Sequence, residues 1–83
     1  MDRKKLIILY VYDFLQMAKA NNKYLLQKDI LDGIVNVFDI DCDRRTINRN
    51  IKYLQEYGCK IIYEKDKGYL LVDKPNLLIL KKK

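Results

Sequence analysis

The side chains with the most chemical capacity in this sequence lie in one stretch, residues 43–58, which reads DRRTINRNIKYLQEYG. At the 100° per residue of an α-helix, Arg45, Arg49 and Lys52 fall on one side. No acid joins that side before Glu56. Guanidinium groups donate paired hydrogen bonds to phosphate and to guanine, whereas an ordinary solvated helix mixes charges of both signs. The stretch therefore predicts a helix face that contacts a polyanion.

The same stretch holds the signals that would begin, end and orient this helix. Asp43 suits the N-cap position, because its carboxylate can accept a hydrogen bond from a free backbone N–H of the first turn. Gly58 suits the left-handed position that follows a helix. Between them, Ile47, Ile51 and Leu54 recur at i, i+4 and i+7. This aliphatic stripe must face a core, which turns the cations outward.

Composition favours the same class of partner. The 83 residues carry 17 Lys and Arg against 11 Asp and Glu, a net charge of +6, and 49% are hydrophobic. That hydrophobic content suffices for one small core, so a single domain is expected. Residues 1–43 hold six basic and seven acidic side chains, whereas residues 44–83 hold eleven basic and four acidic ones. The basic second half favours an anionic partner.

Other chemistries find little support. The sequence has no histidine, no Gly-rich phosphate loop and no set of nucleophile and base, so we expect neither an enzyme nor a cofactor. The aspartates between positions 29 and 43 fit helix caps better than a metal site. Their DIDCD run lacks the Gly and the terminal Glu of a calcium loop. We therefore expect no bound metal.

The cysteines and the apolar runs bear on location. Cys42 and Cys59 flank the predicted helix and would lie about 25 Å apart at ~1.5 Å per residue, too far for a disulfide. We expect free thiols in a reducing cytosol and no zinc site. The apolar run Leu6–Tyr12 is too short to span a membrane and Asp13 interrupts it, and no signal peptide is evident. A cytoplasmic protein is therefore expected.

Two further helices are predicted ahead of the cationic one. Residues 3–20 are apolar on nearly every side, so a second surface is expected to cover part of that helix. Residues 26–39 show helical spacing, with Ile30 and Ile34 on one face. Gly33 lies inside this segment, where it either permits a close approach between helices or has no structural role.

Alternation replaces the helical period after residue 58. Residues 60–65 and 69–72 predict two strands, joined by a DKG turn at residues 66–68 whose glycine takes a positive φ. Tyr63 and Tyr69 are expected in the core or in an interface, rather than as a platform for stacked bases.

The domain is expected to span residues 1–74, followed by an apolar and basic arm at residues 75–83. The run Leu77–Leu80 would dock on the helix at residues 3–20, in the same chain or in a homodimer.

Three helices followed by a hairpin are the element order of a winged helix-turn-helix, an α+β fold whose third helix enters the major groove of DNA. The stretch at 43–58, followed by IIYEKDKGYLL at 61–71, also resembles the N-terminal winged helix of WYL-domain transcriptional regulators and their DeoR-like relatives. That family's pattern runs R-[RK]-T-I-x-R-D-I-x-x-L-x-x-x-G and later G-Y-x-L. Residues 5–72 fit it, with Asn50 where the family usually has Asp. The resemblance implies sequence-specific binding of double-stranded DNA and regulation of transcription.

Geometry and resemblance together assign the base contacts. The DNA-binding residues are expected on the third helix and the hairpin: Arg44, Arg45, Thr46, Asn48, Arg49, Lys52, Tyr53, Lys65 and Lys67. Arg45, Arg49 and Lys52 are expected in the major groove, with Asn48 at an adenine edge.

The remaining residues of this set are assigned to phosphates. Arg44 and Thr46 near the helix N-terminus, and Lys65 and Lys67 on the wing at 64–68, are expected to hold phosphate, and the wing can also reach the minor groove. Tyr53 either bonds a phosphate through its hydroxyl or packs against the hairpin.

Two alternatives stay open for the chain as a whole, and one for the start of the second helix. The chain could be a winged helix that binds another protein through its first helix and Leu77–Leu80. It could be the DNA-binding part of a longer regulator, since the sequence ends near the point where a WYL domain would begin. Gln27 and Lys28, at the start of the second helix, are better explained as solvated residues than as contacts to the DNA backbone. If the chain dimerises, half-sites ~34 Å apart are expected.

Overall fold

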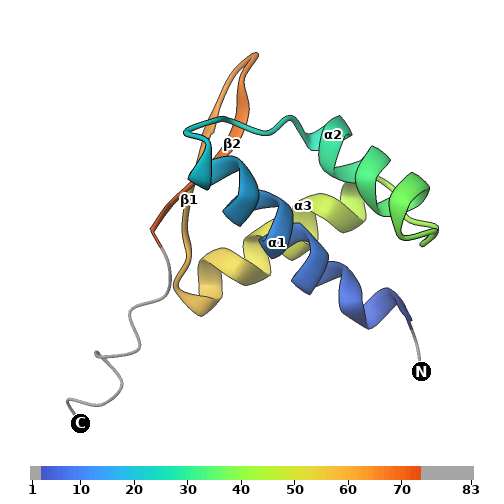
Figure 1. Cartoon of the computed structure of the whole chain (residues 1–83). Coiled ribbons are helices and arrows are strands. Elements are labelled where there is room, and N and C mark those ends of the chain that lie inside the picture. Colours follow the sequence, from blue (N-terminus) through green and yellow to red (C-terminus); the bar gives the residue numbers. More distant parts are fainter. Residues whose placement is uncertain (1–2, 74–83) are drawn as a thin grey trace, which may run out of the picture.

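The computed structural model describes residues 3–73, which form three helices and one antiparallel hairpin (Figure 1). The elements are α1 (Ile7–Ala20), α2 (Gln27–Asp32), α3 (Arg44–Tyr57), β1 (Lys60–Glu64) and β2 (Gly68–Asp73). The α+β class and the element order agree with the sequence prediction. The arm at residues 75–83, with its run Leu77–Leu80, lies outside the described residues.

One hydrophobic core joins the three helices and the hairpin. Its buried residues are Ile7, Val11, Leu15, Ile30, Ile34, Ile40, Ile47, Ile51, Leu54, Cys59, Ile61 and Leu71. The predicted stripe of α3 is confirmed, because all three of its aliphatic side chains are buried. Helix α1 contributes Ile7, Val11 and Leu15, one residue per turn, so its buried face is a single stripe.

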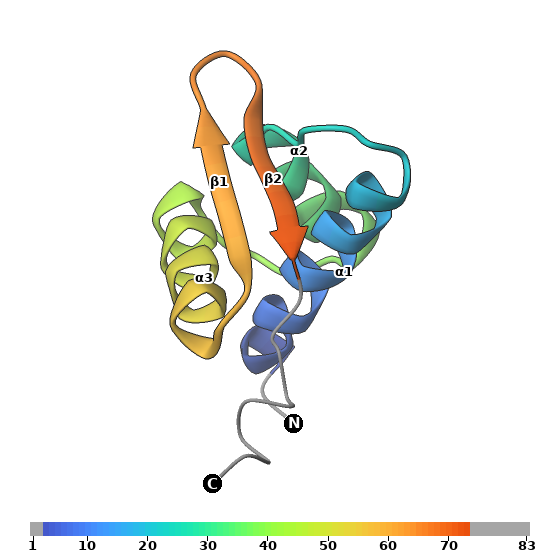
Figure 2. The same ribbon diagram turned by 90° about the vertical axis from the view of Figure 1, so that its left-hand side faces the viewer.

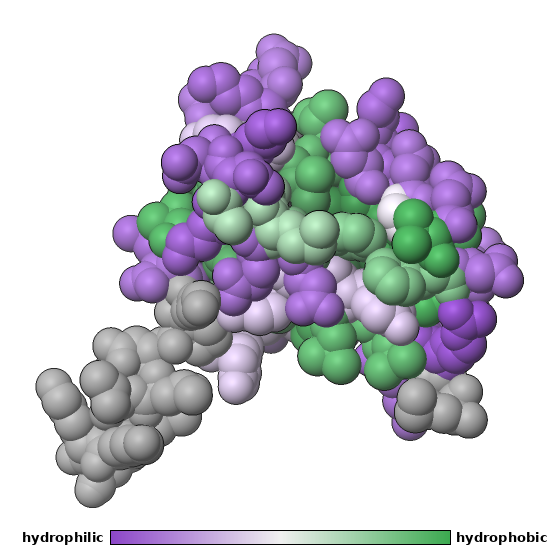
Figure 3. Space-filling model, in the orientation of Figure 1, coloured by the Kyte–Doolittle hydropathy of each residue, from purple (hydrophilic) through white to green (hydrophobic). Residues whose placement is uncertain are grey.

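The first helix is shorter than predicted, and the segment that follows α2 covers its second side, whereas the sequence assigned that role to Leu77–Leu80 or to a second chain. A 3-10 turn at Arg3–Leu6 precedes it. The rings of Tyr10 and Phe38 stack with centroids 3.9 Å apart, and Phe14 packs against Phe38 at 5.7 Å. Much of the apolar surface of α1 that lies outside its buried stripe thus packs against the segment that follows α2. Figure 3 shows both hydrophilic and apolar groups on the face of the molecule that Figure 1 turns toward the viewer.

The second helix differs from its predicted span of 26–39. The α-helix ends at Asp32, and a π-helical turn follows at Gly33–Val37, with Phe38 N–H donating to the carbonyl of Gly33. A Cβ on Gly33 would lie 2.7 Å from Cζ of Phe14. Of the two readings of this glycine, close approach is therefore the one that the packing supports.

Both predicted ends of α3 are confirmed. Asp43 is the N-cap, and its side chain accepts the backbone N–H of Thr46. Gly58 has φ 119°, the left-handed conformation that a Cβ would disfavour. Ile40 is buried in the turn that leads into α3, which anchors this turn in the core.

The hairpin pairs Ile61 with Leu71 and Tyr63 with Tyr69 on one face. Ile61 and Leu71 are buried, whereas Tyr63 is 63% exposed. Of the two places expected for Tyr63, the core or an interface, the core is therefore ruled out. The shared face continues along the hairpin beyond the helices, and Tyr63 there packs its ring against Tyr69 at 5.1 Å.

A third strand segment, which the sequence did not predict, ties the hairpin to the helices. The backbones of Leu25 and Tyr69 exchange two hydrogen bonds of 2.8 Å. Gly68 begins β2 with φ 101°, as predicted, and a Cβ there would lie 2.3 Å from the carbonyl oxygen of Leu25. In Figure 2, α3 lies on the β1 side of the hairpin, and α1 and α2 lie on the β2 side.

Candidate nucleic-acid interface

The outward face of α3 carries the cations that the sequence placed there. Arg44, Arg45, Arg49 and Lys52 are all exposed. In the part of the chain that the structure describes, none of them forms a salt bridge. An ion pair does join Lys67 to Glu64 on the hairpin. This face is therefore a concentration of positive charge without direct ion pairs, held outward by the buried stripe behind it.

The N-terminus of α3 is already occupied by a carboxylate. Oδ1 of Asp43 accepts the Thr46 N–H at 2.9 Å and the Thr46 hydroxyl at 3.0 Å. The backbone hydrogen bond from Thr46 is the largest cause of a lowered Asp43 pKa, followed by its hydroxyl and by the charges of Arg45 and Arg49. Asp43 is thus ionised at neutral pH.

This cap changes the phosphate contacts expected at the N-terminus of α3. Thr46 has one hydroxyl proton, and that proton is donated to Asp43. In this geometry Thr46 offers no donor to a phosphate, and a phosphate on the helix axis would meet the Asp43 carboxylate. Arg44 is exposed beside the cap, so its guanidinium is accessible to an anion at this first turn.

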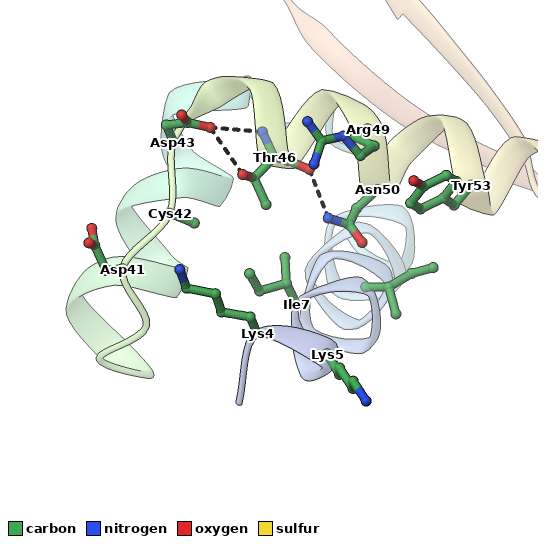
Figure 4. A pocket seen from close by; sticks show the side chains of 11 residues that line it. Lys4, Lys5, Ile7, Asp41, Cys42, Asp43, Thr46, Arg49, Asn50 and Tyr53 are labelled. Atoms are coloured by element: carbon green, nitrogen blue, oxygen red, sulfur yellow. Dashed lines mark hydrogen bonds between the residues drawn. The ribbon is translucent and has the colours of Figure 1, made fainter. Parts of the chain in front are cut away.

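One open groove of about 690 Å³ lies between α3 and the N-terminal turn (Figure 4). Lys4 and Lys5 line one side of it, and Arg49 and Tyr53 line the other. The N-terminal turn is held in place by Arg3, whose guanidinium donates to the backbone carbonyls of residues 38 and 39. The groove therefore brings cations from two segments that are distant in sequence beside the carboxylates of Asp41 and Asp43.

The α1 side of α3 also accounts for two polar residues of that helix. Tyr53 is 48% exposed and lines the groove with the N-terminal lysines, so it faces α1 rather than packing against the hairpin. Asn50 is half-buried and donates from Nδ2 to the Thr46 carbonyl at 2.8 Å. The Asn50 side chain therefore makes a hydrogen bond to the backbone of its own helix.

A second groove, of about 320 Å³, lies on the other side of α3, between α2 and the hairpin. Its lining comes from three elements: Leu26, Gln27, Lys28, Arg44, Asn48, Tyr63, Gly68 and Tyr69. The predicted residues of α3 thus separate into two groups. Arg44 and Asn48 face the hairpin side, and Thr46, Arg49 and Tyr53 face the α1 side, while Arg45 and Lys52 line neither groove.

Asn48 lies at the centre of a hydrogen-bonded group in the hairpin-side groove. Its Oδ1 accepts the Gln27 amide and, at 3.0 Å, the Tyr69 hydroxyl. Gln27 also donates to the carbonyl of Arg44, at 3.3 Å. Gln27 is thus half-buried and structural, not merely solvated, and the adenine contact expected of Asn48 meets an amide whose oxygen is already engaged.

The two lysines of the wing are not equivalent. Lys67 Nζ lies 3.8 Å from Glu64 Oε1 and 5.5 Å from the centre of the Tyr24 ring. A hydrogen bond to Glu64 is also the main cause of a raised Tyr24 pKa. Lys65 is exposed and has no such contacts among the described residues. Lys65 is therefore the freer cation of the hairpin tip.

Several residues of these grooves were not predicted from the sequence. Lys4 and Lys5 have no motif around them, and only the fold brings them to α3. Tyr69 was expected in the core or in an interface, and it does pack half-buried against the core, but the contact of its hydroxyl with α3 was not predicted. The G-Y-x-L pattern of the family that the sequence resembles includes this tyrosine. That pattern was therefore the sequence feature that could have identified Tyr69.

Both cysteines are free thiols. Burial, and then the charges of Asp43 and Asp41, raise the pKa of Cys42, and burial raises that of Cys59. Across residues 3–73, no three metal-binding side chains gather into a site. Within the same range, every helix is too short or too polar to cross a membrane.

No family model, curated protein or solved structure matches this chain. Its function is therefore inferred from the geometry and charge of the surfaces around α3.

Proposed function

We propose that this chain is a winged helix-turn-helix domain that binds double-stranded DNA with sequence preference and acts in transcription regulation. The carrying observation is the outward face of α3, where Arg44, Arg45, Arg49 and Lys52 are exposed and free of salt bridges among the described residues. Like charges gathered in this way repel one another, and a polyanion relieves that repulsion.

The dimensions of α3 support this proposal. An α-helix with its side chains is about 10–12 Å across, which fits the roughly 12 Å wide major groove, and the 14 residues of α3 give it a length of about 21 Å. Arg45 and Lys52 lie on the ridge between the two grooves, so they are the proposed base readers together with Arg49. Arg44 and Lys65 are the proposed phosphate contacts at the hairpin side.

Titration of the whole chain with a labelled random duplex, at several salt concentrations, tests the proposal. We expect the logarithm of the affinity to fall linearly with that of the salt concentration, with a slope of about 0.9 per neutralised phosphate. The double variant Arg45→Ala with Arg49→Ala should lose most of its affinity for the duplex. Lys19→Ala with Lys23→Ala, which removes two cations outside both grooves, is the matched control. Absence of duplex binding at low salt, or equal loss in both variants, would refute the proposal.

One observation favours a second candidate, a module that binds another protein. Leu9 and Met17 of α1 are 57% and 63% exposed. They are two turns apart on one face, and Asp13 lies between them, so the apolar surface is interrupted. Replacing both with Ser should leave DNA binding intact under the first proposal. Self-association of the wild type in light scattering that the variant loses, with no DNA binding in either protein, would favour the second candidate, with a second copy of this chain as the partner.

A further inference from the structure

The hydrogen bonds around Asn48 fix which way its amide points. The carbonyl oxygen of Arg44 can only accept, so the Gln27 atom that faces it at 3.3 Å must be the donor Nε2. The same Nε2 faces Asn48, so the Asn48 atom on that side must be the acceptor Oδ1. A backbone carbonyl, whose chemistry is unambiguous, thus orients both amides.

The acceptor capacity of Asn48 is then used up. A carbonyl oxygen has two lone pairs, and Oδ1 accepts one hydrogen bond from Gln27 and one from the Tyr69 hydroxyl. Nδ2 carries two N–H groups that have no partner among the described residues, and the residue is exposed. Asn48 therefore offers only donors to a molecule that approaches α3.

We propose that Asn48 is a specificity-determining residue that selects a G·C pair, by donating from Nδ2 to the acceptor edge of guanine. This inference depends on the proposed DNA binding. Guanine presents two adjacent acceptors, O6 and N7, in the major groove. Adenine presents an acceptor beside the N6 amino group, so reading it with an amide requires Oδ1, which Gln27 and Tyr69 occupy. The adenine contact expected from the sequence is thereby replaced.

Selection of bound duplexes from a random pool tests the choice of base. The wild type and Asn48→Ala are compared, and the base-pair position whose preference disappears in the variant is the one that Asn48 reads. We expect that position to be G·C in the wild type, with about a two- to tenfold loss of affinity in the variant. An Asn48-dependent preference for A·T would overturn the inference. So would a loss that is equal for all sequences, or no loss.

A second pair of substitutions tests whether the hydrogen bonds from Gln27 and Tyr69 determine which base Asn48 selects. Gln27→Ala combined with Tyr69→Phe frees both lone pairs of Oδ1 while keeping Asn48. The Tyr69 backbone pairing with Leu25 and its ring contact with Tyr63 do not need the hydroxyl, so the hairpin should fold. We expect the preference at the position read by Asn48 to shift toward A·T. An unchanged G·C preference in a variant whose circular dichroism matches the wild type would overturn the inference.

The outcomes separate this inference from the function on which it depends. If the wild type binds no duplex, the proposed function fails and the inference fails with it. If the wild type binds duplex DNA and the Arg45 and Arg49 variants weaken it, but Asn48 selects adenine, only the inference fails.

Discussion

The Tyr69 hydroxyl of β2 donates a hydrogen bond of 3.0 Å to Oδ1 of Asn48 on α3. This bond joins the hairpin to the helix that carries the cations, although the two residues are 21 positions apart. Gln27 joins α2 to the same oxygen. Three elements that could each contact DNA are therefore held by one side chain, which fixes their relative positions before any partner binds.

The groove on the α1 side predicts a phosphate contact outside the recognition helix. Lys5 is exposed there, on the opposite lining from Arg49. We expect Lys5→Ala to weaken binding equally for all duplex sequences and to reduce the salt slope by about 0.9, because one phosphate contact is lost. Fluorescence anisotropy at several salt concentrations measures this slope. A change in base preference without a change in slope would contradict the assignment.

The unequal environments of the wing lysines predict unequal effects. Lys65→Ala should reduce the salt slope by about 0.9, since its charge is free to meet a phosphate. Lys67→Ala should have a smaller effect, because Glu64 already lies 3.8 Å from its ammonium group. Glu64→Gln is the matched control and should raise affinity, since it removes an acid from the wing. A larger loss in the Lys67 variant would show that the wing contacts DNA differently.

Local signals in the sequence predicted much of this fold. The cap Asp43, the left-handed Gly58 and the buried stripe of α3 depend on residues a few positions apart, and the structure has all of them. The two strands and the positive φ of Gly68 follow from equally local patterns.

The features that the sequence did not reveal are contacts between distant segments. The pairing of Leu25 with Tyr69 requires knowing where the hairpin lies, because Leu25 shows no strand pattern of its own. The exposure of Tyr63 was missed for the same reason, since alternation gives the face but not where the core ends. The hydrogen bonds that occupy Oδ1 of Asn48 come from Gln27 and Tyr69, which lie far from it in the sequence.

The Asp43 cap predicts a pH dependence of stability. Hydrogen bonds from Thr46 lower the Asp43 pKa below its ordinary value of 3.8. A carboxyl group whose pKa is lower in the folded state stabilises the fold above its unfolded pKa, and this contribution is lost as the pH falls through the folded pKa. Asp43→Asn keeps the acceptor oxygen but cannot titrate. We therefore expect the thermal midpoint of the wild type to fall more than that of the variant between about pH 5 and about pH 3. Parallel curves would contradict this account.

Gly68 and Gly33 predict two different costs for the same substitution. At Gly68, alanine would need φ 101° and would place its Cβ 2.3 Å from the backbone oxygen of Leu25, which is held by pairing with Tyr69. The left-handed φ alone costs about 1–2 kcal/mol, and the backbone clash adds to it. At Gly33 the nearest atom is Cζ of Phe14, 2.7 Å away at the end of a side chain, so overpacking of about 1–3 kcal/mol is expected. Urea unfolding should therefore show Gly68→Ala as the more damaging change, because a side chain can shift and a paired strand cannot. The reverse order would mean that the Leu25 segment yields more easily than the Phe14 ring.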